Sequence, residues 1–260
     1  MEEAAARFPQ RKAYEDETCS MTFSEVRRLA ASIGTGIAAL ENPGRPVAVF
    51  MEKSVWMAVS LLGVSCGGCI YCPVDVAMPE ARMDRILSVL EPAAVLTSGS
   101  MGARAREACG DCPVLLVEDL AARPADEALL ASLRARIKSS DPLYILFTSG
   151  STGMPKGVVG THQTVLNNLE WLASRFDLGP DDVLGNQAPL HFVVADHDLY
   201  CPLKFGCSSF FIPAGYFSFP AKLIPLLNQH RVTTVFWVPF ALGTIASLRA
   251  LDEILPEFLR

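Results

Sequence analysis

Short apolar segments alternate with segments of helical periodicity along most of this sequence, and that alternation limits the possible folds more than any other feature. Uncharged runs of about four to eight residues are typical of buried strands, and apolar residues three and four apart are typical of core-facing helices. A chain that alternates the two predicts largely parallel sheets covered by helices on both faces. We therefore expect an α/β fold.

The first half of the chain shows the alternation clearly. Thr22 and Glu25 form a capping-box pattern, which predicts a helix that runs to about Leu40. Further helices are predicted over 55–64 and from Pro79, and peripheral helices within 104–138. Strands are predicted over 47–51, 70–73, 94–97 and 114–117.

The second half continues in the same way. Helices are predicted from His162, with Thr161 as its cap, from Asp196, and over 220–229. Strands are predicted over 143–148, 157–159, 182–186, 208–212 and 232–238.

Composition excludes several classes of protein. The 260 residues are 50% hydrophobic and 19% charged, which argues against a disordered chain, and the length allows one large domain or two small ones. The formal net charge of −6 argues against a nucleic-acid partner, because phosphate binding needs clustered Lys and Arg. The first eight residues, MEEAAARF, do not resemble a secretory or transit signal, so we expect a cytoplasmic protein.

One uncharged stretch, over 54–74, is long enough to span a bilayer. The glycines Gly67 and Gly68 and the proline Pro73 interrupt it. A buried helix that turns on glycines into a buried strand gives the same pattern. We therefore expect no membrane span.

The eight cysteines include two patterns that could hold a metal. Cys66, Cys69 and Cys72 have C-x2-C-x2-C spacing, and Cys109 and Cys112 have C-x2-C spacing. An iron–sulfur or zinc site built from both groups is one interpretation. Val76 stands where the ferredoxin spacing needs a fourth ligand, so we favour the other interpretation, that reduced cysteines act as small core residues.

A polar loop follows the apolar strand predicted at 143–148. Its glycines allow backbone N–H groups to approach an anion, its hydroxyls add donors, and its one lysine adds positive charge. The spacing is not that of the Walker loop, because Pro155 and Gly157 stand where Gly and Ser or Thr belong. A plain surface loop explains so many such residues poorly. The residues are Thr148, Ser149, Gly150, Ser151, Thr152, Gly153, Lys156 and Gly157.

These residues, TSGSTGMPKG, resemble the signature loop of the adenylate-forming (AMP-binding) superfamily, which includes acyl-CoA synthetases, D-alanine carrier-protein ligases and the adenylation domains of nonribosomal peptide synthetases. The segment MTFSEV (21–26) and the segment GGCIYCPVD (67–75) also resemble segments of that family. The segment GNQAPLHFVVADHDLY (185–200) is most similar to the carrier-protein ligases and amino-acid adenylation domains.

The resemblance implies an ATP-dependent ligase. A carboxylic or amino acid attacks the α-phosphorus of ATP to give an acyl-adenylate and pyrophosphate, and a phosphopantetheine or CoA thiol then takes the acyl group. It also implies that the loop hydroxyls bind the β- and γ-phosphates, that the glycines let the loop wrap them, and that Lys156 offsets their charge as the catalytic residue. Mg²⁺ is expected with ATP. His162 is either a residue of this site or a plain helix-start histidine.

The same resemblance places the acid-binding residues at Phe192, Val193, Val194 and His197. Amino-acid-activating members carry an aspartate at the position of Val193, where it pairs with the α-ammonium of the substrate. Valine there predicts either an acid without an α-amino group or a shifted alignment in which Asp196 or Asp198 serves. A metal site built from His191, Asp196, His197 and Asp198 is a further alternative, and we expect no protein-bound metal.

Family members of this kind are about twice as long. The resemblance therefore implies that residues 1–260 are the N-terminal part of an adenylation domain, without its C-terminal part and small mobile lid. We predict that this chain alone binds ATP weakly and does not turn over. The alternative is a catalytically dead nucleotide-binding or scaffold remnant.

Overall fold

A computed structural model describes residues 1–149, 154–249, 251–252 and 254–260. The chain divides into two compact units, and each is described by itself. One unit contains Val26–Asn168, and the other contains Met1–Glu25 together with Leu169–Arg260.

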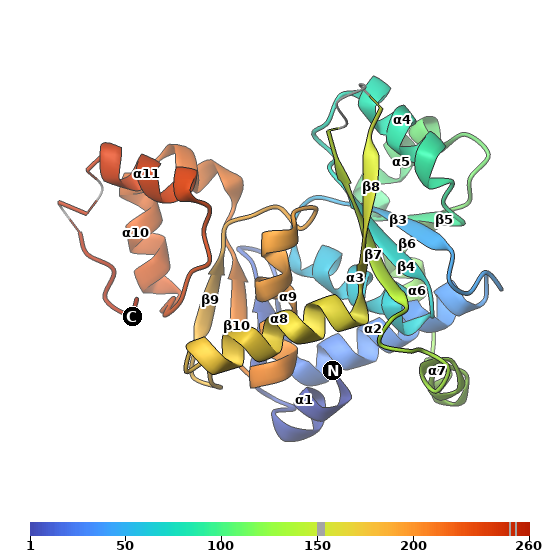
Figure 1. Cartoon of the computed structure of the whole chain (residues 1–260), viewed down its shortest axis with the longest axis horizontal. Helices are drawn as coiled ribbons and strands as arrows, with labels where there is room; N and C mark the ends of the chain where they lie inside the picture. The colour runs from blue at the N-terminus through green and yellow to red at the C-terminus, as the bar shows by residue number, and fades with distance from the viewer. Residues whose placement is uncertain (150–153, 250, 253) are drawn as a thin grey trace. The chain divides into compact units, whose positions relative to one another are not determined.

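The unit formed by Val26–Asn168 is built on a six-stranded sheet with the strand order β6-β5-β3-β4-β7-β8 (Figure 1). All neighbouring strands are parallel except β7 and β8, which pair antiparallel. This confirms the prediction of a largely parallel sheet. The strands are β3 (Pro46–Phe50), β4 (Ile70–Val74), β5 (Ala94–Thr97), β6 (Val114–Leu116), β7 (Pro142–Thr148) and β8 (Lys156–Thr161).

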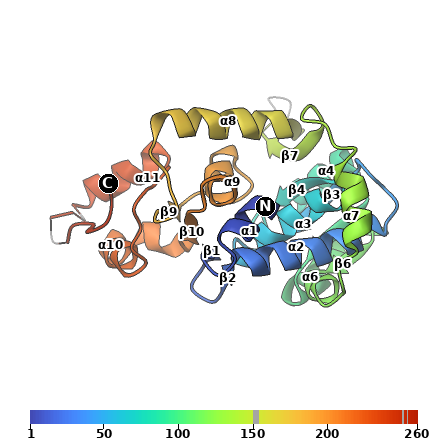
Figure 2. The same cartoon turned by 90° about the horizontal axis from the view of Figure 1, so that it is seen from below.

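Helices cover both faces of this sheet, as predicted. Ala48 and Phe50 of β3 pack in one core cluster with Met83 and Leu90 of α4 (Glu80–Leu90). Successive strand residues point to opposite faces, so Val47 and Val49 face the other side, where they are fully buried. On that side lie α2 (Phe23–Ala38) and α3 (Val55–Cys66), opposite α4 in Figure 2.

The predicted start of α2 is confirmed atom by atom. The Thr22 backbone N–H donates to Glu25 Oε2 at 2.8 Å, and the Glu25 N–H donates to Thr22 Oγ1 at 3.3 Å. The peripheral helices were also predicted. They are α5 (Gly102–Cys109), α6 (Val117–Ala121) and α7 (Glu127–Arg134), whereas the short η1 (Gly99–Met101) before them was not predicted. Within the described residues, no helix has the length and hydrophobicity that a bilayer crossing requires.

The other unit contains a four-stranded sheet with the strand order β2-β1-β10-β9. Only β1 and β2 pair antiparallel. Its strands are β1 (Lys12–Glu15), β2 (Ser20–Thr22), β9 (Val183–Asn186) and β10 (Ser208–Phe211). Its helical segments are α1 (Glu2–Arg7), η2 (Val193–Ala195), α9 (Asp196–Phe205), η3 (Ala214–Ser218), α10 (Pro220–Gln229) and α11 (Pro239–Ser247), and α8 (His162–Arg175) ends in this unit.

The strand predicted over 232–238 is wrong. Thr234 forms a single parallel bridge with Leu184, in which Gly185 N–H donates to the Thr234 carbonyl at 2.9 Å. The next rung of a parallel ladder would use the Gly185 carbonyl, which instead accepts the indole N–H of Trp237 at 2.7 Å. A side chain thus occupies the backbone acceptor, and the ladder ends after one bridge. The sequence patterns also gave no indication of α1, β1 and β2.

Asp182, just before β9, is a buried carboxylate that accepts several hydrogen bonds. It accepts hydrogen bonds from Thr233 Oγ1 at 2.6 Å, Gly179 N–H at 2.9 Å and Arg260 at 2.7 Å, and only 1% of the residue is exposed. Burial raises its pKa, but the bonds from Thr233, Gly179 and Arg260 outweigh burial and lower the pKa below its ordinary value.

We expect Asp182→Asn to lower the free energy of unfolding at neutral pH by about 2 kcal/mol, because three donors lose a charged acceptor. A depressed folded pKa stabilises the fold above the unfolded value, and this stability disappears as the pH falls through the folded pKa. Urea unfolding should therefore show the difference between variant and wild type shrinking at acid pH. Asp181→Asn is the matched control: Asp181 pairs with Arg11 on an exposed surface, so about 0.5 kcal/mol or less is expected. A pH-independent difference would contradict the charge argument.

Candidate functional site

The predicted phosphate loop connects two antiparallel strands. Thr148, the last residue of β7, lies opposite Lys156, the first residue of β8, and Phe147 lies opposite Gly157. The Thr148 hydroxyl donates to the Lys156 carbonyl at 3.4 Å. Because β7 runs parallel to β4, the loop leaves the carboxyl end of the strands, the end at which open parallel sheets bind ligands.

The polar side chains at this edge are open to solvent. Thr148, Ser149 and Lys156 are all exposed, and so is Met154 at 45%. The structure brings Thr148 and Lys156 together across the hairpin. Gly150, Ser151, Thr152 and Gly153 lie outside the described residues.

Gly157 and Gly160 have a packing role in β8. A Cβ atom at Gly157 would lie 2.9 Å from the Ile145 side chain, and one at Gly160 would lie 2.1 Å from the Tyr144 ring. Both glycines therefore let the side chains of β7 lie across β8. The sequence pattern placed Gly157 in the phosphate loop, and it gave no signal of the Tyr144 contact.

His162 lies at the other end of this hairpin. Pro142 pairs with Thr161 at one end, and Thr148 pairs with Lys156 at the other. Since a strand advances about 3.4 Å per residue, His162 is roughly 20 Å along the strand direction from the loop. Burial lowers its pKa, while Asp141 raises it. The distance of His162 from the loop favours the interpretation of His162 as a plain helix-start histidine. Thr161 caps α8 as predicted, and its Oγ1 accepts from Thr164 N–H at 3.2 Å.

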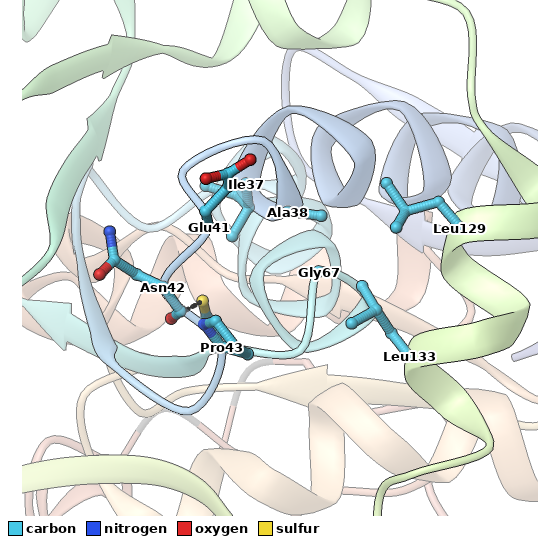
Figure 3. Close-up of a pocket in the computed structure, with 9 residues that line it drawn as sticks. Ile37, Ala38, Glu41, Asn42, Pro43, Gly67, Leu129 and Leu133 are labelled. Carbon is cyan, nitrogen blue, oxygen red and sulfur yellow. Dashed lines mark hydrogen bonds between the residues drawn. The ribbon is translucent and has the colours of Figure 1, made fainter.

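Two pockets lie at that opposite end of the six-stranded sheet. One, of about 350 Å³, is lined by residues that include Ile70 and Pro142, the first residues of β4 and β7, and His162. The other, of about 220 Å³, lies between α2, α7 and the turn that holds Asn42 and Pro43, as Figure 3 shows. Neither pocket includes a residue of the predicted phosphate loop.

The predicted acid-binding residues lie in the other unit, after β9: Phe192, Val193 and Val194 precede α9, and His197 is in its first turn. Phe192 and Val193 are 54% and 60% exposed, and Val194 is partly buried. Val193 begins the short helix η2, which continues directly into α9. Val193 and His197 are four residues apart on this helical path and therefore share a face.

His197 carries a buried nitrogen that makes no hydrogen bond to any described atom. That atom is Nδ1, and the ring lies 4.8 Å from the Phe236 ring. Burial lowers the pKa of His197, so the imidazole is neutral at pH 7. The contact with Phe236 was not predicted, because it joins positions far apart in the sequence that carry no local pattern.

Asp198 is committed to the interior of its unit. It is 1% exposed, its Oδ2 accepts from Asn186 Nδ2 at 2.7 Å, and its carbonyl accepts from Ser209 Oγ at 2.6 Å. Asp196 is the first residue of α9, whose N-cap is Ala195 rather than Asp196. A buried carboxylate that is already bonded is poorly placed to meet a substrate ammonium.

Two of the patterned cysteines are core residues, in agreement with the interpretation favoured from the sequence. Cys69 and Cys72 are 5% and 0% exposed, and burial raises their pKa values to about 11 and about 12. Cys66, Cys109 and Cys112 are only partly buried. Among the residues that the structure describes, no three His, Cys, Asp or Glu side chains gather as a metal site.

Comparison with known proteins places this geometry in a family. A family model described as AMP-binding enzyme matches residues 1–258. Vanchrobactin synthetase VabF of Vibrio anguillarum is 30% identical over 257 residues, which are 94% of this chain and 8% of that protein. An L-proline–[L-prolyl-carrier protein] ligase of Pseudomonas fluorescens is 28% identical over 93% of this chain and 50% of its own length.

Solved structures agree with the sequence relatives. The nonribosomal peptide synthetase FmoA3 superposes with a TM-score of 0.84 at 28% identity, over 99% of this chain and 27% of that chain. Its form with bound AMPPNP gives a TM-score of 0.82 at 27% identity. The chain thus spans half or less of the length of each of these proteins.

Proposed function

This chain belongs to the AMP-binding enzyme family of adenylate-forming ligases, and from that membership we propose that it is the N-terminal part of an adenylation domain that activates a carboxylic acid with ATP. The observation that carries the proposal is the hairpin between β7 and β8. It presents Thr148, Ser149 and Lys156 at the carboxyl end of a parallel sheet.

In the proposed reaction, an oxygen of the acid's carboxylate attacks the α-phosphorus of ATP, and the bond to pyrophosphate breaks. Little covalent chemistry falls to the protein, so its residues act by position and charge. The exposed hydroxyls of Thr148 and Ser149 donate to the β- and γ-phosphates, and Thr148 gives up its long 3.4 Å bond to the Lys156 carbonyl to do so. Lys156 offsets the charge of the departing pyrophosphate. Ser151 and Thr152 add donors, while Gly150, Gly153 and Gly157 let the chain pass close to the phosphates.

The Mg²⁺ ion of this reaction would be carried mainly by the triphosphate. Mg²⁺ keeps a near-octahedral shell of oxygens and in proteins is commonly held by substrate phosphates with few protein ligands. The hydroxyls at Thr148 and Ser149 suit that arrangement, since they are neutral oxygens open to solvent. A phosphopantetheine or CoA thiol would then take the acyl group from the adenylate.

The acid is proposed to lack an α-amino group. Phe192, Val193, Val194 and His197 would line its site, with Val193 nearest the α-carbon. A valine leaves an α-ammonium without a partner, at a cost of a few kcal/mol if the ammonium is desolvated. The bond from Asn186 to the buried Asp198 supports this choice over a shifted alignment that uses Asp198.

Binding of acyl sulfamoyladenosines, which are unreactive mimics of acyl-adenylates, tests the proposal without requiring turnover. Calorimetry on the 260-residue chain should show ATP and AMP binding, and at least one mimic bound about 100-fold more tightly than AMP, because it fills the acid and nucleotide sites together. A folded chain that binds none of these would overturn the proposal. Binding of ATP and AMP, with no mimic from a broad set of acids bound more tightly than AMP, would instead indicate a nucleotide-binding remnant.

A further inference from the structure

Cys109 and Cys112 lie at the two ends of a tight turn that joins α5 to β6. The Cys112 backbone N–H donates to the Cys109 carbonyl at 3.1 Å, which closes a four-residue β-turn. Gly110 has φ 55° and ψ −124°, close to the values of about 60° and −120° for the first central residue of a type II′ turn. The two cysteines therefore occupy the first and last positions of a defined turn.

That turn sets the separation that a disulfide needs. The end residues of a β-turn have Cα atoms less than about 7 Å apart, and disulfides join Cα atoms about 4.4–6.8 Å apart. Both side chains are reduced and partly exposed. Cys112 Sγ donates weakly to the Pro92 carbonyl at 3.4 Å and to the Pro113 carbonyl at 3.9 Å, so little is lost when it turns toward Cys109.

The chain provides a natural comparison in Cys66 and Cys69, which have the same spacing. No turn closes between them, because the Cys69 N–H donates to the Val64 carbonyl rather than to Cys66. Cys69 is 5% exposed, and its Sγ donates to the Asn42 carbonyl at 3.3 Å. Spacing alone therefore does not distinguish the two pairs, whereas the turn and the exposure do.

We propose that Cys109 and Cys112 are a reversible redox site, in which a low-molecular-weight disulfide such as oxidised glutathione converts the two thiols into an intramolecular disulfide. One cysteine, as its thiolate, attacks the oxidised glutathione, forms a mixed disulfide and releases one glutathione thiolate. The second cysteine gives up its proton, attacks the protein sulfur of that mixed disulfide and releases a second glutathione. Two protons leave the protein thiols and two glutathione thiols form, so the step balances.

The environment of Cys109 and Cys112 sets the rate at which the two thiols are oxidised. Burial, with a contribution from the neighbouring Cys112 thiol, raises the pKa of Cys109 to about 11, and burial also raises the pKa of Cys112. Few thiolates are present at neutral pH, so oxidation is slow there and accelerates about tenfold per pH unit toward pH 9. The same high pKa values make each cysteine a poor leaving group, so the closed disulfide resists reduction.

Peptide mapping after oxidation tests the proposal. Trypsin separates the two pairs. Because Pro124 blocks cleavage after Arg123, Cys109 and Cys112 lie in the peptide Glu107–Arg134, and Cys66, Cys69 and Cys72 lie in Ser54–Arg82. Folded protein is incubated with oxidised glutathione, alkylated and digested. We expect the peptide over 107–134 to lose two hydrogens and both alkylation sites, while the peptide over 54–82 keeps its thiols.

Single variants identify the mechanism. Cys109→Ser and Cys112→Ser should each trap one glutathionyl group on the remaining cysteine, because no second thiol resolves the mixed disulfide. In denaturant, Cys109 and Cys112 should no longer form a disulfide faster than Cys66 and Cys69. The proposal is overturned if the 107–134 peptide of folded wild-type protein keeps two alkylatable thiols or carries two glutathionyl groups. It is also overturned if the thiols of the 54–82 peptide oxidise equally fast.

Discussion

Lys156→Ala is expected to weaken the binding of ATP to this chain by about 10- to 100-fold and to leave the binding of AMP unchanged. Lys156 begins β8 opposite Thr148 and is exposed, so the charged interaction it loses is the proposed one with the triphosphate. A hydrogen bond to a charged group contributes about 1.5–3 kcal/mol, which is that range of affinity. Calorimetric titration of both nucleotides measures the difference directly.

The matched control is Lys138→Ala. Lys138 is also exposed and lies in the same unit, before β7, at the end of the strand away from the loop. It should leave both affinities within twofold of wild type. If Lys156→Ala and Lys138→Ala weaken ATP binding equally, the effect comes from the overall charge of the protein and not from the loop. If neither substitution weakens ATP binding, the loop does not hold the phosphates.

The fold was predictable because local and global preferences agree along most of the chain. Thr22 and Glu25 indicate the start of α2, the run at 94–97 is β5 to the residue, and α10 spans the predicted 220–229. The failure at 232–238 has a different cause. Its sequence is apolar and β-branched, but Trp237 takes the Gly185 carbonyl, and no local pattern reports a competition between residues 52 positions apart.

The candidate site was predictable to a different extent in each part. The glycines, hydroxyls and lysine around Thr148 and Lys156 indicate an anion-binding loop by their residue types alone. The position of His162 needed the register of β7 and β8, which only pairing reveals. The Nδ1 of His197, which bonds to no described atom, and the bond from Asn186 to Asp198 both depend on burial and long-range contact, which sequence spacing does not encode.

Those buried contacts also bear on whether the acid carries an α-amino group. Asp198 is buried and held by Asn186, so this carboxylate is poorly placed to meet an α-ammonium near Val193. His197 is neutral, so it adds no charge there either. An acid without an α-amino group has no ammonium left unpaired at Val193. Placing a carboxylate at that position should therefore reverse the preference between acids with and without an α-amino group.

Val193→Asp is therefore expected to change the discrimination between paired acyl sulfamoyladenosines by about 100-fold, or about 3 kcal/mol. The pairs are phenylpropanoyl with phenylalanyl, and propanoyl with alanyl, which differ only in the α-amino group. Wild type should prefer the member without it, and the variant should prefer the member that carries it. Val193 is 60% exposed, so the substitution should leave the fold intact.

Val193→Asn, with nearly the same shape as aspartate and no charge, should leave the wild-type preference in place, because a neutral amide supplies no counter-charge to an ammonium. A wild-type chain that already prefers the amino members, or an aspartate that behaves like the asparagine, would show that Val193 does not face the α-carbon of the acid.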